Sequence, residues 1–418
     1  MRFVHVADVH LDTSFAGRSD AIRRRLREAS REAFRAAVDL ALREDVHAFL
    51  VAGDLFDSER LSFSTERFLL DQAGRLADHG ITLVYATGNH DPGSPESGPR
   101  PIPWPPNVRV VADGTPQHIT VHGHDGAPVG HVTAAGHATS QERSDLSRRF
   151  PRPLGDLPEV ALLHTQVHAS RGSAEHQPYA PSELTFLARA GYDYWALGHV
   201  HVRQTLSQDP PVVYPGSLQG RTHADTGPRG AYLVDLSDRA GPALSFRSLA
   251  PVRWETLRVD GLQDAGSLDR LEQRIVTLWR AVRAADPGLP GTEWMVRVAL
   301  EGPTPLWREV RRDEDRATLA AELGEQLGAL DVLVVAEGAH PVLAVEDHRR
   351  RTDVLGEALR LLEAVRRGEA RLGGLDPSAL ATATSDDPRA VESLVRELSA
   401  GTDGELAARL LGLEDGGA

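Results

Sequence analysis

The chain opens with short aliphatic runs that alternate with longer stretches in which apolar residues recur every three or four positions. The runs cover residues 2–7, 48–52 and 81–86, and the stretches between them cover 20–44 and 62–79. Short β-branched and aliphatic runs are typical of strands buried on both faces, whereas the longer spacing is typical of amphipathic helices. Strand and helix in alternation predict a parallel sheet built from βαβ units, with Asp20 as the cap of the first helix.

The pattern changes near residue 108 to closely spaced short strands. Asp125-Gly126 predicts a hairpin between 117–122 and 128–134. Further strands are expected at 160–163, 193–197, 211–214, 230–236 and 243–248. A sheet that begins parallel and ends in antiparallel strands predicts an α/β fold, a two-sheet sandwich flanked by helices.

Beyond residue 250 the predicted elements describe different units. A small α+β domain is expected from strands 252–259, 293–301 and 331–336 and helices 267–285 and 313–329. Two apolar-striped helices, 352–370 and 387–413, follow on either side of a flexible segment, 373–388. We therefore expect three domains, 1–250, 251–340 and a helical tail, 341–418. The stripe of Val354, Ala358, Leu361, Leu362 and Val365 either folds back on its own domain or docks on a partner.

Five of the apolar runs end in residues that can bind a metal ion. These endings are Asp8 with His10, Gly53-Asp54, Gly88-Asn89-His90-Asp91, His164, and Gly198-His199-Val200-His201. Because reactive groups in α/β proteins gather beyond the carboxyl ends of strands, the five endings predict one site. Strand alternation would place Asp8 and His10 on the same side, and Gly53 would allow close backbone approach.

The candidate ligands are too many for one tetrahedral ion and about right for two. They are Asp8, His10, Asp54, Asn89, His164, His199 and His201. Mixed nitrogen and oxygen donors suit Mn, Fe or Zn better than Ca or a dedicated Mg site. Two such ions would clamp the attacking and leaving oxygens of a displacement at phosphorus, so no Ser or Cys nucleophile is needed. His90 is left to protonate the leaving oxygen or to bind an equatorial oxygen.

Composition narrows the class of protein. The absence of cysteine excludes disulfides and thiolate zinc sites. A net charge of −14 disfavours nucleic-acid binding over the whole surface but leaves room for a local basic path. The candidates for such DNA contacts are Arg143, Arg148, Arg149 and Arg152. No apolar stretch approaches the roughly 18 residues of a membrane span and no secretory signal is visible, so we expect a cytoplasmic protein.

The order of these motifs resembles that of the calcineurin-like metallophosphoesterases. The segments His5–Asp12, Gly88–Pro92 and Tyr214–Arg221 are similar to those of the SbcD-type DNA repair nucleases, and closest to the YhaO-like exonucleases. Protein Ser/Thr phosphatases carry Arg where this chain has Ser58, which argues against the phosphatase branch. Archaeal and eukaryotic nucleases carry a second active-site His where this chain has Asp57, whereas the bacterial branch commonly has Asp.

The resemblance implies roles for the individual residues. Asp8, His10 and His201 would hold one metal and Asn89, His164 and His199 the other, with Asp54 bridging them. His90 would be the catalytic acid or a transition-state contact. Asp57 and Asp91 would support the ligands without binding metal. The implied cofactor is a pair of divalent ions, Mn before Fe, Zn or Mg.

We therefore expect a metal-dependent DNA exonuclease or endonuclease that hydrolyses phosphodiester bonds in DNA repair. The family implies an SMC-type ATPase partner bound through the C-terminal helices, and often a homodimer; domain 251–340 would cap the DNA. The alternatives are a phosphoesterase for a small nucleotide or cyclic nucleotide, and a metal-stabilised scaffold without activity. His5, His122, His124 and His168 are expected to be structural or solvated residues.

Overall fold

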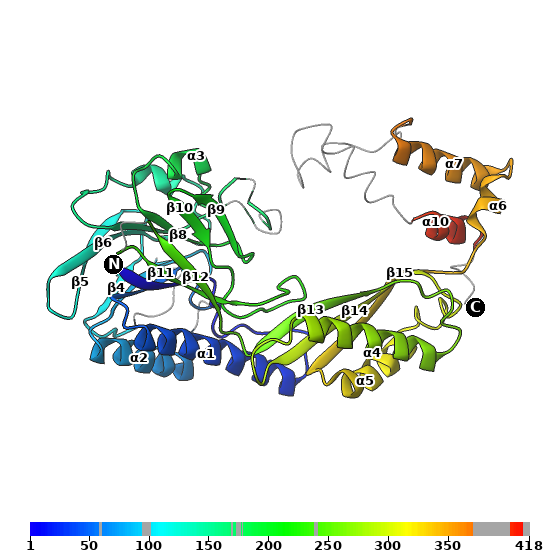
Figure 1. Cartoon of the computed structure of the whole chain (residues 1–418), viewed down its shortest axis with the longest axis horizontal. Helices are drawn as coiled ribbons and strands as arrows, with labels where there is room; N and C mark the ends of the chain where they lie inside the picture. Colours follow the sequence, from blue (N-terminus) through cyan, green and yellow to red (C-terminus); the bar gives the residue numbers. More distant parts are fainter. Residues whose placement is uncertain are drawn as a thin grey trace. The chain divides into compact units, whose positions relative to one another are not determined.

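The computed structural model describes the chain in two compact units (Figure 1). The described residues are 1–57, 61–93, 102–168, 170–172, 177, 179–237, 241–370 and 402–412. The first unit is Met1–Trp254 with Gly288–Glu293, and the second is Glu255–Pro287 with Trp294–Ala418. Within the described part of the chain, every helix is too short or too polar to cross a bilayer.

The first unit contains two six-stranded sheets. One has the order β12 (Ala243–Ser248), β11 (Gly230–Asp235), β1 (Arg2–Val6), β2 (Ala48–Ala52), β3 (Thr82–Ala86), β4 (Val108–Val111). The other has the order β5 (Gln117–His122), β6 (Pro128–Ala135), β7 (Glu159–His164), β8 (Tyr194–Gly198), β10 (Pro211–Tyr214), β9 (Gln204–Gln208). The strands β1–β4 and β6–β7–β8–β10 are parallel, and antiparallel strands pair at their edges. The predicted two-sheet α/β sandwich is therefore confirmed, although β9 was not expected.

Alternating side chains of the central strands enter two different cores. Val4 and Phe49 pack with α1 (Asp20–Arg43) and α2 (Phe63–Asp78), which cover the outer face of the first sheet (Figure 1). Phe3 and Leu50 instead pack between the two sheets, against side chains of the second sheet. This burial on both faces is the reason that the strands read as continuous apolar runs.

The cap of the first helix lies one residue earlier than predicted. The Ser19 side chain accepts a hydrogen bond from the Ile22 amide, and Asp20 is the first helical residue. The prediction of Asp20 as the cap was wrong because a Ser in extended conformation precedes it. Asp20 lies in the first turn, where a negative charge is favourable.

His5 lies between the two sheets, as a structural residue rather than a ligand. It is fully buried, and its Nδ1 lies 3.1 Å from the Tyr194 hydroxyl. Burial lowers the pKa of His5 to about 3, from an ordinary value near 6.5. The folded protein therefore keeps His5 neutral at a pH where the unfolded chain takes up a proton.

His5→Leu is expected to make the protein less sensitive to acid. Between pH 7 and pH 5 the unfolded state binds a proton that the folded state excludes, so His5 should lower the free energy of unfolding by about 2 kcal/mol over this range. Urea unfolding at both pH values would measure the difference in pH slope between the two proteins. His122→Leu, at an exposed position, is the control. Equal slopes for wild type and His5→Leu would contradict the prediction.

The second unit is built on a three-stranded sheet in the order β13 (Val252–Val259), β14 (Glu293–Pro303), β15 (Asp331–His340). Helices α4 (Leu268–Ala285) and α5 (Asp313–Leu327) pack on the sheet through one apolar core. Trp279 of α4 anchors this core, and its indole nitrogen donates to the Leu327 carbonyl at 3.0 Å. All five of these elements lie close to their predicted ranges.

The tail folds back on itself within the second unit. It contains α6 (Val345–Arg349), α7 (Val354–Arg367) and α10 (Asp403–Leu410). Leu355 and Leu359 of α7 pack against Ala407 of α10. Gly404 lies so close to the His340 ring of β15 that a Cβ atom there would come within 2.1 Å of a ring carbon. The expected flexible segment 373–388, and most of the expected helix 387–413, lie outside the described residues.

The inward face of α7 differs from the predicted stripe. Leu355, Leu359 and Val365 are buried, whereas Val354 and Leu361 are 75% and 43% exposed. The stripe prediction was therefore wrong at Val354 and Leu361. Asp353 caps the helix by accepting from the Gly356 amide, and contacts with α10 then bury the neighbouring row of side chains.

Candidate metal centre

The predicted site residues meet beyond the carboxyl ends of β1, β2, β3, β7 and β8. Asp8, His10 and Asp54 have left-handed backbones, with φ of 48°, 49° and 51°, and His199 has a φ of 105°. Positive φ values in residues other than Gly carry strain and persist only where the surrounding structure holds them. The expectation that strand alternation aligns Asp8 with His10 was wrong, because β1 ends at Val6 and both residues lie in a strained loop.

Backbone hydrogen bonds join this loop to the one after β2. The Asp8 amide donates to the Gly53 carbonyl at 3.2 Å, and the His10 amide donates to the Asp54 carbonyl at 2.9 Å. Leu11 and Phe56 then form a parallel bridge. The two chain segments therefore present Asp8, His10 and Asp54 from one stiff support.

Two glycines allow the loops to approach one another. A Cβ atom on Gly53 would come within 2.2 Å of the His164 ring, and the φ of Gly53 is +81°. A Cβ atom on Gly88 would come within 2.2 Å of the Asp54 carboxylate. Any larger residue at either position would displace a candidate ligand.

Asp8, His10 and His201 form the first group of converging donors, with ligand atoms within 4.8 Å of one another. The Nε2 atoms of His10 and His201 are 3.3 Å apart, and His201 Nε2 is 3.9 Å from Asp8 Oδ1. Asp8 and His10 are completely buried. The three residues could therefore hold one ion.

The second group is Asp8, Asp54 and His164, and Asn89 and His199 adjoin it. Asn89 Oδ1 is 3.0 Å from both His164 Nε2 and His199 Nδ1. Asp54 Oδ2 lies 3.4 Å from His164 Nε2 and 3.7 Å from His10 Nε2. Asp54 therefore stands between the two groups, where a bridging ligand would be.

The charges of the cluster are arranged for cations. Burial opposes ionisation of Asp54, but the neighbouring His164 imidazole holds the pKa of Asp54 well below its usual value. Burial opposes protonation of His164, yet Asp54 raises its pKa to about 9. Burial, reinforced by Asp54, raises the pKa of Asp8 to about 7. Adjacent buried carboxylates and facing imidazole nitrogens fit two divalent ions, which would replace protons at these atoms.

His90 lies beside the donors and is held by Asp57. His90 Nδ1 is 2.5 Å from Asp57 Oδ1, and Arg221 Nη1 and Thr13 Oγ1 contact Asp57 Oδ2 at 3.0 and 3.1 Å. Burial opposes protonation of His90, but the Asp57 and Asp54 carboxylates raise its pKa. His10, Asp57 and His90 also converge, but the short His90–Asp57 contact is a hydrogen bond rather than space for an ion.

Asp91 holds the loops that carry the candidate ligands Asp54 and Asn89. Its carboxylate accepts hydrogen bonds from the backbone amides of Asp54, Leu55 and Gly88. Burial, followed by the nearby Asp54, raises the pKa of Asp91 to about 6. Asp57 and Asp91 thus contact the loops and side chains that carry the candidate ligands.

Sequence reasoning missed three residues of this site. His137 is buried, and its Nε2 lies 2.7 Å from the His164 carbonyl oxygen. Asp225 faces His201, with Oδ1 at 3.8 Å from Nδ1, and Arg221 contacts Asp57. A signal for His137 existed, because Gly136-His137 follows the predicted strand 128–134 just as the candidate ligands follow their predicted strands. Arg221 lies in the Tyr214–Arg221 segment that resembles the SbcD-type nucleases, but the sequence alone indicates no role for it.

Other candidates are not members of the converging donor groups found among the described residues. The segment between β6 and β7 carries the four predicted DNA-contact arginines, all exposed. In this segment the Arg148 guanidinium stacks 4.2 Å from the Phe186 ring, and Arg149 donates to the Gly114 carbonyl at 3.2 Å. His122, His124 and His168 are also exposed.

Comparisons with known proteins agree with this geometry. The calcineurin-like phosphoesterase family model matches residues 1–203. The uncharacterized metallophosphoesterase YhaO of Bacillus subtilis is 32% identical over 311 residues, 73% of each chain. The DNA double-strand break repair protein Mre11 of Aeropyrum pernix is 27% identical over 81% of this chain and 82% of its own. The SbcD component of the nuclease SbcCD of Escherichia coli is 28% identical over 52% of this chain and 60% of its own.

The family model covers residues 1–203, which contain all of the candidate ligands, and the similarity to YhaO covers most of the chain. The family shares one reaction class, the hydrolysis of phosphoesters with divalent metal ions. This chain therefore belongs to the calcineurin-like metallophosphoesterases, with homologues that include YhaO, Mre11 and SbcD.

Proposed function

We propose that this protein is a two-metal DNA exonuclease or endonuclease. The observation that supports it best is the position of Asp54 between two groups of buried donors. Asp8, His10 and His201 would hold one ion, and Asn89, His164 and His199 the other. Asp8 reaches the second group as well. When bound, the two ions would stabilise the attacking and leaving oxygens at phosphorus.

Manganese is the ion we propose first. Imidazole nitrogens and carboxylate or amide oxygens make up the whole donor set, and such mixed sites suit Mn, Fe or Zn. Metal content after purification without chelators, measured by mass spectrometry, should give about two ions per chain. Activity restored best by Zn or Mg would change the assignment.

His90 would donate the proton that the leaving oxygen needs. Asp57 accepts from Nδ1, which leaves Nε2 to carry a proton toward the substrate. The raised pKa of His90 favours this protonated form. Arg221 and Thr13 fix the Asp57 carboxylate, so they position His90 indirectly.

DNA is the substrate that the homologues support. Relatives named as a double-strand break repair protein and a nuclease align over half or more of this chain. The four exposed arginines between β6 and β7 would contact the phosphate backbone. The sheet of β13–β15 with α4 and α5 would cap the DNA.

The test is degradation of linear duplex DNA by the purified protein with Mn²⁺. We expect nucleotide release that depends on metal and disappears with a chelator. Assays with blunt, 5′-overhanging and 3′-overhanging ends would give the polarity. Hydrolysis of nucleotide monoesters or cyclic nucleotides alone would replace the DNA proposal with a small-substrate phosphoesterase.

A protein partner would bind the exposed apolar side chains of α7. We propose an SMC-type ATPase, which would act with this nuclease on DNA in the cytoplasm. Val354 and Leu361 remain exposed although α7 packs on α10. Val354→Asp with Leu361→Asp should abolish binding to the ATPase but preserve folding.

Leu359→Asp is the matched control, because Leu359 is buried and its replacement should unfold the tail. Co-purification with the ATPase and light scattering of the complex would report binding and any homodimer. Unchanged binding by the double variant would remove α7 as the docking surface.

A further inference from the structure

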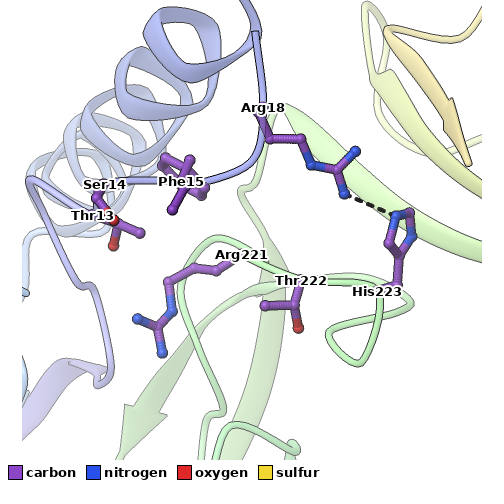
Figure 2. A pocket seen from close by; sticks show the side chains of 8 residues that line it. Thr13, Ser14, Phe15, Arg18, Arg221, Thr222 and His223 are labelled. Carbon is purple, nitrogen blue, oxygen red and sulfur yellow. Dashed lines mark hydrogen bonds between the residues drawn. The ribbon is translucent and has the colours of Figure 1, made fainter.

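A pocket opens beside the residues that hold His90 (Figure 2). It measures about 340 Å³, within the range of roughly 300–1,000 Å³ typical of small-molecule sites. One wall is the loop before α1, and the other is the segment after β10. The residues that line the pocket include Thr13, Phe15, Arg18, Arg221, Thr222 and His223.

Two of these residues connect the pocket to the reactive centre. Thr13 donates either to the His10 carbonyl or to Asp57, at 2.8 and 3.1 Å. Arg221 Nη1 contacts the same Asp57 oxygen at 3.0 Å. A group bound in the pocket would therefore lie next to the Asp57–His90 pair rather than at a remote surface.

Two guanidinium groups give the pocket its positive charge. The Arg18 guanidinium lies 5.4 Å from the Trp254 ring centroid, and its Nη2 is 3.1 Å from His223 Nε2. Arg221 is only 15% exposed, and its Nε has no hydrogen-bond partner among the described residues. Asp57 balances the Arg221 charge, and the Arg18 guanidinium also lines the pocket.

Hydrogen bonds hold the backbone of the loop before α1, which forms one wall of the pocket, in a fixed conformation. Asp12 and Phe15 have left-handed backbones, with φ of 64° and 47°, in the same loop as Asp8 and His10. The Asp12 carboxylate accepts from the Ser62 amide at 2.9 Å and from the Thr65 hydroxyl at 2.5 Å. Strained but well-bonded loops are a feature of binding sites.

We propose that this pocket binds a second phosphate group of the substrate, the one next to the scissile phosphate along the strand. This inference rests on the proposed nuclease function and names a subsite of it. Arginine side chains bind phosphate oxygens through two parallel N–H donors, and Arg18 and Arg221 both line the pocket. Thr13 and Thr222 place one hydroxyl group on each wall of the pocket.

The test uses chromogenic esters of thymidine. The p-nitrophenyl phosphate is placed on either the 5′ or the 3′ hydroxyl, and the other hydroxyl is free or phosphorylated. For one of the two pairs, the second phosphate should raise kcat/KM of wild type about tenfold to a hundredfold, the effect of a hydrogen bond to a charged group. The pair that responds also gives the direction of the strand.

Arg18→Gln should reduce this gain to about twofold or less, and Arg18→Lys should retain part of it because the charge remains. Arg109→Gln, which removes an exposed charge on β4, is the matched control and should keep the full gain. Melting temperatures would confirm that each variant folds. A methyl ester on the second phosphate distinguishes an internal strand phosphate from a terminal phosphate. A gain in kcat/KM that survives the methyl ester assigns an internal strand phosphate. A gain that disappears assigns a terminal phosphate.

Two results would overturn the subsite. One is a wild type that hydrolyses the thymidine esters without any gain from the second phosphate. The other is an equal loss of activity in Arg18→Gln with and without that phosphate. Hydrolysis of the esters without degradation of DNA would instead refute the proposed function and leave the comparison valid. If no ester is hydrolysed, calorimetry with thymidine 3′,5′-bisphosphate and thymidine 5′-phosphate makes the same comparison by binding.

Discussion

Asp54→Asn is expected to strip both metal ions and to lower phosphodiester hydrolysis by about a thousandfold or more. Asp54 Oδ2 stands between His10 and His164, so one substitution weakens both ligand groups. Loss of the ions removes several kcal/mol of charge stabilisation at phosphorus, and each 1.36 kcal/mol corresponds to about a tenfold change in rate. Asn keeps the shape of Asp54 but lacks the negative charge that offsets two cations.

Asp54 also has a second role, which is to hold the His90 backbone: its Oδ1 accepts a hydrogen bond from the His90 amide at 2.9 Å. The substitution tests this role as well. Metal content by mass spectrometry and hydrolysis of bis(p-nitrophenyl) phosphate are the measurements. Asp78→Asn, at an exposed position in α2, is the control. Two ions per chain in Asp54→Asn would refute the bridging role.

Thermal unfolding gives a separate view of the same variant. Ions that bind only the folded state raise its stability by an amount that grows with their concentration. We therefore expect Mn²⁺ to raise the melting temperature of wild type and to leave that of Asp54→Asn nearly unchanged. A similar melting temperature for both metal-free proteins would show that the loss of activity is not a loss of fold.

Most of the fold could be predicted because the local pattern and the tertiary contacts agree. β2 is apolar at every position, since Phe49 faces the helices and Leu50 faces the other sheet. β9 was missed because its sequence, Gln204–Gln208, is polar at most positions and lies at a sheet edge. The inward face of α7 was mispredicted because its partner, α10, lies far away in the sequence.

The site could be predicted only where a strand end marks it. Asp54 and His164 directly follow or end apolar runs, so parallel pairing brings them to the same edge. Asp225 follows no such run: the Ala7–Ser217 bridge brings its segment near β1, a contact that no local pattern reveals. The left-handed conformations of Asp8 and His10 depend likewise on hydrogen bonds to the loop after β2.

His90→Ala is expected to lower cleavage of DNA by about a hundredfold to ten-thousandfold while both ions remain bound. Proton transfer by a positioned side chain contributes this much, and the ligand groups around Asp54 do not need His90. Metal content separates this variant from Asp54→Asn. His168→Ala, at an exposed position on the loop after β7, is the control. Cleavage at the wild-type rate would remove His90 from the mechanism.

The leaving group distinguishes the two roles open to His90. If it protonates the leaving oxygen, His90→Ala should lose far less activity on a p-nitrophenyl ester, whose leaving group needs no proton, than on DNA. An equal loss on both substrates would instead indicate contact with an equatorial oxygen. An acid must be protonated, so DNA cleavage should fall as pH rises through the raised pKa of His90. In Asp57→Asn that fall should begin at lower pH, because the carboxylate that raises the pKa of His90 is gone.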